Sequence, residues 1–76
     1  MVEINNEMIK LNQIICVGFL NDRGNFEVLS GRLYLYNDKF IHLDHSYNFQ
    51  ELEDTTRIRI DKIKYCRVTI DNLWRG

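Results

Sequence analysis

The sequence contains neither proline nor alanine among its 76 residues. Alanine is the strongest helix former, whereas the plentiful Ile, Val, Tyr, Phe and Thr favour strands. No run approaches the roughly 18 apolar residues of a membrane span, and the first residues are acidic and polar where a secretory signal is basic and then apolar. We therefore expect a β-rich protein that stays in the cytoplasm and enters no membrane.

Net charge is also nearly absent, because ten Lys and Arg stand against eleven Asp and Glu, for a formal charge of -1. This balance excludes general electrostatic attraction to nucleic acid or anionic lipid, so such binding would need a local patch. Cysteine is limited to Cys16 and Cys66, each in an apolar run, which predicts reduced core thiols rather than a disulfide or metal ligands. The length predicts one small domain over residues 1–76, with little interior for an enclosed active site.

Alternation of apolar and polar residues predicts a first strand from about residue 9 to Leu20, with Ile15, Val17 and Phe19 facing inward. The residues before it leave two interpretations open. Their spacing also fits one face of a helix, formed by Ile4, Met8, Leu11 and Ile15. A short N-terminal helix that leads into a shorter strand is therefore an alternative to strand in residues 2–14.

The dense turn signal at 21–25 predicts a hairpin into a second strand over Phe26–Tyr36. Apolar residues change parity across Gly31, with Phe26 and Val28 before it and Leu33 and Leu35 after it. This shift predicts a bulge or sharp bend at Gly31. A tight turn at 37–39, a third strand at 40–43 and a long acidic loop at 44–55 follow.

The last third of the chain predicts two more strands. Residues 56–60 alternate, with Ile58 and Ile60 inward and the arginines outward, and a single turn at 61–63 leads to a fifth strand at 64–70. In that strand Cys66, Val68 and Ile70 share one face, and Tyr65, Arg67 and Thr69 share the other. These elements predict an all-β, small, strongly bent five-stranded barrel of the SH3-like or Sm-like kind, with an OB-fold as the alternative.

Two stretches resemble the signatures of the Sm-like family. Leu20–Leu43 is similar to the first signature, with Gly31-Arg32-Leu33 in its strand, and Ile58–Ile63 looks like the second. The resemblance implies a barrel and ring assembly through edge strands. In the family an Asp and an Asn of the first signature and an Arg-Gly of the second build a pocket for an RNA base. The corresponding positions here are Asn37, Ile41, Arg59 and Ile60, so only the arginine carries over.

No constellation predicts catalysis, a cofactor or a metal. His42, Asp44 and His45 lie close in sequence, but strand alternation places His45 on the face opposite the other two. No nucleophile elbow, phosphate loop or dinucleotide fingerprint is present, and the carboxylates of the acidic loop fit a solvated charge run. We therefore expect a protein that is not an enzyme.

The strongest functional signal is a group of basic and aromatic residues on the predicted strands. Residues 57–67 carry five basic side chains against Asp61, a charge of +4, so the rest of the chain carries -5. Arginine binds phosphate and carboxylate through its fork of donors, and aromatic rings supply stacking planes. The predicted ligand or partner surface consists of outward-facing residues on strands expected to be adjacent: Arg32, Tyr34, Tyr36, Arg57, Arg59, Tyr65 and Arg67.

These features predict a non-enzymatic binding module that forms homo-oligomers through open barrel edges. The first hypothesis is an adaptor or inhibitor of a protein partner, a function typical of small barrels encoded by phages or mobile elements. The alternative is an Sm-like ring that binds RNA or a phosphorylated nucleotide through the arginine and tyrosine face.

Overall fold

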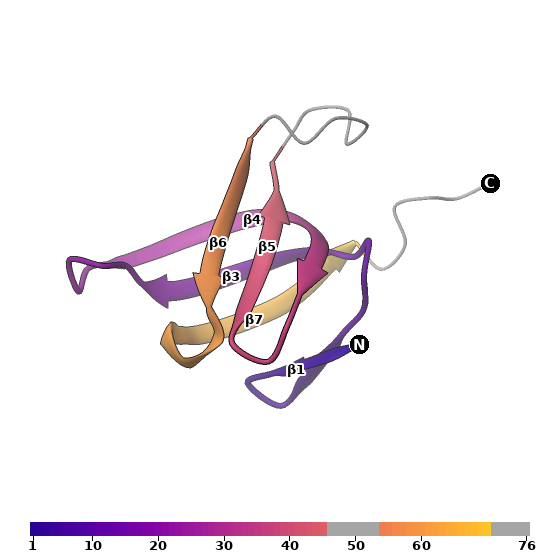
Figure 1. Ribbon diagram of the computed structural model, residues 1–76, viewed down its shortest axis with the longest axis horizontal. Helices are drawn as coiled ribbons and strands as arrows, with labels where there is room; N and C mark the ends of the chain where they lie inside the picture. The colour runs from indigo at the N-terminus through magenta and orange to yellow at the C-terminus, as the bar shows by residue number, and fades with distance from the viewer. Residues whose placement is uncertain (46–53, 71–76) are drawn as a thin grey trace.

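A computed structural model describes residues 1–45 and 54–70 of the chain, and these residues form strands joined by turns (Figure 1). In chain order the elements are β1 (Val2–Ile4), β2 (Glu7–Ile9), β3 (Ile14–Leu20), β4 (Phe26–Tyr36), β5 (Phe40–Asp44), β6 (Thr55–Arg59), the 3-10 turn η1 (Ile60–Lys62) and β7 (Ile63–Ile70). The all-β class is confirmed. Most of the predicted acidic loop lies outside the described residues.

Five strands form one antiparallel sheet in the order β6-β5-β4-β3-β7. The sheet is not closed into a barrel, so β6 and β7 are its two edges. In Figure 1, β5 and β6 run steeply across β3 and β4, and the β3–β4 hairpin projects beyond β6. We call the end of this hairpin, residues 19–29, the arm. Within the described residues no helix is long and apolar enough to cross a membrane.

The N-terminal residues form a hairpin of their own, β1–β2. Asn5 and Asn6 have φ angles of 52° and 69°, the left-handed pair that a two-residue hairpin turn requires and that asparagine tolerates. Ile4 and Ile9 are fully buried. The helical alternative is therefore wrong, and the first strand of the main sheet begins at Ile14 rather than near residue 9.

Strand β4 bends because it serves two neighbours. Its first part pairs with β3 from Phe26 to Arg32, and its last part pairs with β5 from Arg32 to Tyr36. Pairing with β3 is regular through Gly31, and the register shift lies between Leu33 and Leu35 in the ladder with β5. The bulge predicted at Gly31 is therefore displaced toward the C-terminal end of the strand.

Gly31 has a different role from the one expected of it. A Cβ atom at this position would lie 3.0 Å from the carbonyl oxygen of Asp44 and 3.0 Å from Nδ1 of His45. The residue thus permits close approach of β5, and no left-handed φ angle is involved. Phe26 and Val28 lie on the exposed face, so the hydrophobic stretch before Gly31 is not a core segment.

The core lies on the inner face of the bent sheet and is capped by the β1–β2 hairpin. Its buried apolar residues are Ile4, Ile9, Ile15, Val17, Phe19, Leu33, Ile41, Leu43, Ile58, Ile63 and Cys66. The inward positions expected for Ile15, Val17 and Phe19 are confirmed. Burial of the Cys66 thiol, which disfavours the charged thiolate, raises its pKa to about 11. Both cysteines are free, and Cys16 is half-buried on the outer face.

Candidate functional site

The predicted arginine and tyrosine surface is divided between the two edges of the sheet. Arg57 and Arg59 are exposed on β6, whereas Tyr65 and Arg67 are exposed on β7, with three strands between them. The expectation that these strands are adjacent is wrong, because β7 pairs with β3 across the sheet. One ligand that touches both pairs in a single copy would have to span the sheet.

Arg32 is not an outward residue. Its guanidinium donates from Nη1 to Oδ1 of Asn12 at 2.7 Å and from Nη2 to Oδ2 of Asp44 at 3.0 Å, in a buried environment. Register explains this burial, since Arg32 lies directly opposite Asp44 on β5. The arginine therefore joins β4, β5 and the segment before β3.

The bulge in β4 separates the two tyrosines that were predicted to share a face. Tyr36 pairs with the buried Ile41 and packs against the core, and its hydroxyl accepts a hydrogen bond from the amino group of Met1. Tyr34 lies against the ring of His42, with ring centroids 6.0 Å apart. Of this pair, only Tyr34 is linked to an exposed arginine, through His42 on β5, which pairs with Arg57 on β6.

Four basic residues and one aromatic residue line the pockets where β5 and β6 meet the β4–β5 turn and η1. We call this group the β6 corner, and it consists of Lys39, Phe40, Arg57, Arg59 and Lys62. The carbon Cζ of Arg57 lies 4.5 Å from the centroid of the Phe40 ring, a cation–π contact. Arg59 donates from Nε and Nη2 to the two carboxylate oxygens of Asp61, at 3.1 and 2.8 Å.

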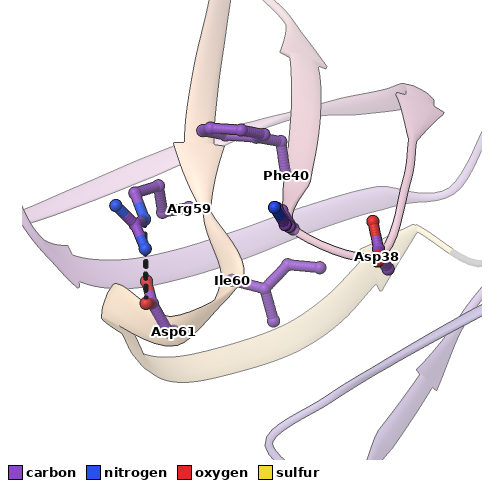
Figure 2. Close-up of a pocket in the computed structure, with 6 residues that line it drawn as sticks. Asp38, Phe40, Arg59, Ile60 and Asp61 are labelled. Atoms are coloured by element: carbon purple, nitrogen blue, oxygen red, sulfur yellow. Dashed lines mark hydrogen bonds and ion pairs between the residues drawn. The ribbon is translucent and has the colours of Figure 1, made fainter.

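A cavity of about 600 Å³ opens beside the β6 corner, between the β4–β5 turn and η1. Figure 2 shows Phe40, Arg59 and Asp61 around it, and Asp38, Lys39 and Ile60 complete the wall. The amide of Ile60 donates to the carbonyl of Lys39 at 2.9 Å and so joins the two turns. Aromatic, cationic and acidic groups therefore share one open site, which suits binding of a flat polar group.

A larger groove of about 760 Å³ runs on the other side of β6, between this strand and the arm. Consecutive residues of β6, Thr56 through Arg59, form one wall, and residues from the end of β3 and the start of β4 form the other. Leu29, which is partly buried, and the core residues Phe19 and Ile58, which are 7% and 2% exposed, line its apolar base. This groove thus lies beside a sheet edge to which the described residues add no further strand.

The outer face of β3, β4 and β7 carries a third surface. Phe26, Val28 and Tyr65 expose 57%, 56% and 41% of their surface and lie around Gly18, which pairs with both Val28 and Tyr65. The Phe26 ring covers Gly18, since a Cβ atom there would lie 2.5 Å from its Cζ. We call these four residues the apolar face.

The histidines and Asp44 each have a structural partner. His45 contacts the Ser30 carbonyl through Nδ1 at 2.7 Å and the Thr56 hydroxyl through Nε2 at 2.9 Å. Asp44 binds Arg32, and the ring of His42 lies beside that of Tyr34 at an interplanar angle of 60°. Across residues 1–45 and 54–70 no group of three or more His, Cys, Asp or Glu side chains could hold a metal ion.

Sequence reasoning missed Phe40, Lys39 and Lys62 as site residues. A signal was present for Phe40, because alternation with Ile41 and Leu43 places it on the face that carries the β6 arginines. Comparisons of the chain with protein-family models, with curated proteins and with solved structures find no match. The resemblance to the Sm-like family therefore stays a prediction.

Proposed function

We propose that the protein is a non-enzymatic binding module that acts on a protein partner in the cytoplasm, as an adaptor or an inhibitor. The groove beside β6 carries this proposal, because it combines an apolar base, exposed cations and a strand edge to which residues 1–45 and 54–70 add no neighbour. Such a surface suits a polypeptide, whose backbone and side chains engage all three features together. Arginine and aromatic residues are also the residues that most often dominate protein interfaces.

The proposal includes a small bent barrel of the SH3-like or Sm-like kind. The strand order β6-β5-β4-β3-β7 and the single 3-10 turn between the two edge strands support it. The strong bend of β4, which pairs with β3 and then with β5, also fits such a fold. A crystal structure would test it through the separation of β6 from β7.

Self-association is a further part of the proposal. The apolar face exposes three large side chains on neighbouring strands, and a domain of this size has little core to stabilise it alone. We expect light scattering at micromolar concentration to give a mass above that of one chain, and Val28→Lys to lower it. A monomeric mass for the wild type would contradict this part.

A second candidate function is binding of RNA or a phosphorylated nucleotide, and one observation favours it. Phe40 lines the cavity together with Lys39 and Arg59, and the guanidinium of Arg57 lies over its ring. A base stacked on an aromatic ring with phosphate near arginine is the usual arrangement for single-stranded nucleic acid. The nearby carboxylates of Asp38 and Asp61 weigh against a polyanion.

Affinity measurements separate the two candidates. The first probe is a partner recovered from cells and then purified, and the second is a single-stranded oligouridylate. The Arg57→Ala/Arg59→Ala variant should lose partner binding while Arg67→Ala, on the opposite edge, serves as its matched control. For RNA, affinity should fall steeply with salt, with about one unit of slope for each phosphate contact. Equal effects of the two variants would contradict a site at the β6 corner.

A further inference from the structure

The pairing of β6 with β5 determines which residues of β6 direct their backbone N–H and C=O groups toward the outer edge of the sheet. In the ladder with β5, the amide of Ile60 donates to Lys39 and the amide of His45 donates to Asp54, at 2.9 and 2.7 Å. Antiparallel ladders alternate, so Thr56 and Ile58 also direct their N–H and C=O groups toward β5. Arg57 and Arg59 therefore direct theirs away from the sheet, along the free edge.

The groove gives this edge what an added strand requires. An incoming strand would form hydrogen bonds with the backbone of Arg57 and Arg59, and every second side chain would point toward the apolar floor of Phe19, Leu29 and Ile58. Strand β6 is five residues long, which corresponds to roughly 16 Å of extended chain. The site thus matches a short extended segment in length and pattern.

Charge indicates which segment fits. The outward side chains of an added strand would lie next to Arg57 and Arg59, and like charges opposite each other destabilise a sheet. A second copy would offer either its own β6, with the same arginines, or β7, with exposed Lys64 and Arg67. Both edges of this sheet are therefore poor partners for β6, and acidic residues are the complementary choice.

The remaining charges around the groove limit where those acidic residues lie. Asp22 and Glu27 are on the arm, and Glu27 accepts a hydrogen bond from Asn21 at 2.9 Å. Lys62 lies at the β6 end of the groove. The lining charges thus favour acidic side chains along β6 and disfavour them at the arm.

We propose that the free edge of β6 and the groove beside it bind an extended segment of a partner protein, which alternates apolar with acidic residues and adds to the sheet as a sixth strand. This inference rests on the proposed function as a protein-binding module, and it specifies the site and the chemistry of the partner.

The experiment removes one backbone donor and leaves the ladder with β5 intact. Arg59 has a φ angle of -72°, which proline adopts without strain, and its amide points to the free edge. Arg59→Pro therefore deletes that donor, whereas Arg59→Ala deletes the same side chain and keeps the donor. The probe is a fluorescent peptide of about eight residues that alternates valine and glutamate, enough to span β6.

We expect Arg59→Pro to bind this peptide at least tenfold more weakly than Arg59→Ala, with both variants folded by circular dichroism. We also expect the matched peptide with lysine in place of glutamate to bind at least tenfold more weakly than the acidic one. Equal affinities of the two variants would overturn strand addition. Equal affinities of the two peptides, or no binding by either, would overturn the proposal that the bound segment is acidic.

Amide hydrogen exchange on the wild-type protein keeps the test decisive if Arg59→Pro does not fold. Strand addition predicts that the peptide slows exchange at the amides of Arg57 and Arg59, while Lys64 and Arg67 on the other edge are unchanged. Peptide binding without that protection would overturn the inference and leave the proposed function standing, since a purified partner could still bind at the β6 corner. If Arg59→Pro is monomeric while Arg59→Ala remains oligomeric, the edge of β6 pairs with a second copy of the chain. That result would overturn the proposal that it binds a segment of a partner protein.

Discussion

Two arginine–aspartate pairs of similar length occupy contrasting environments. Arg32 and Asp44 approach to 3.0 Å with 11% and 0% of their side chains exposed, and Arg59 and Asp61 approach to 2.8 Å with 58% and 60% exposed. The first pair joins neighbouring strands, whereas the second spans two residues at the start of η1. If distance alone decided, the exposed pair would contribute more to the stability of the fold than the buried pair.

Burial reverses that ranking. A buried charge has lost its hydration, so removal of its counter-charge leaves a large uncompensated penalty, while exposed partners are rehydrated when separated. Arg32 is thereby committed to the fold, and Arg59 keeps a solvent-facing surface that a ligand can use. The same residue type thus has a structural role on β4 and a binding role, as proposed, on β6.

The sharpest test of this contrast removes the buried carboxylate. We expect Asp44→Ala to lower the free energy of unfolding by about 3–5 kcal/mol, which is much of the stability of a small domain. Urea denaturation followed by circular dichroism measures it. The double variant Arg32→Met/Asp44→Leu removes both charges and should recover part of the loss. A cost for Asp44→Ala no greater than that for Asp61→Ala would contradict the comparison.

The backbone around the buried pair offers the next test. Gly31→Val places side-chain atoms against the carbonyl of Asp44, at the same place where Arg32 crosses to β5. We expect a loss of about 1–3 kcal/mol in the free energy of unfolding. Gly18→Ala is a useful control, because the atoms nearest its Cβ belong to the exposed ring of Phe26, which can rotate away. Similar losses in both variants would argue against a tight β4–β5 approach.

Burial should also show itself as a dependence on pH. The pKa of Cys66 is raised from 9.0 to about 11 in the folded protein, so the folded state keeps a proton that the unfolded state releases between those values. This contribution is complete below pH 9 and is lost as pH rises through 11, by at most about 2–3 kcal/mol. Cys66→Val lacks the thiol and should lose less stability than the wild type over the same interval. Parallel curves of unfolding free energy against pH for the two proteins would refute this contribution of Cys66.

The exposed pair should give the smallest effect. We expect Asp61→Ala to change the free energy of unfolding by less than about 1 kcal/mol, and added salt to reduce that difference further. The same variant releases Arg59 from its partner beside the cavity, so binding at the β6 corner should change more than stability does. A large loss of stability would show that this pair is structural as well.

The course of β4 could be predicted from the sequence because turn residues bracket it on both sides. The same reasoning failed for β1 and β2, since the turn at Asn5 and Asn6 carries no glycine and the apolar spacing around it also suits a helix. The available signal was the pair of successive asparagines, because asparagine tolerates the left-handed conformation that both positions of this turn require.

Arg32 shows why the candidate site was only partly predictable. Strand alternation indicates a face, but it does not show what lies opposite on the next strand. Asp44 is 12 residues away in sequence, and only the register between β4 and β5 brings it to Arg32. The bulge at Leu33–Leu35 then reverses the faces, so Tyr36 turns to the core. Phe40 acquires its role through Arg57, again across a ladder that the sequence does not specify.

The pairing of β7 with β3 has a consequence for the order in which the molecule forms. Ile14 pairs with Ile70 and Phe19 with Ile63, so the partners are 56 and 44 residues apart in the sequence. Contacts of such long range slow folding, because the intervening chain must be ordered before they can form. During synthesis β3 therefore lacks one neighbour until β7 has been made, and its apolar side chains stay accessible to chaperones and to other nascent chains throughout that interval.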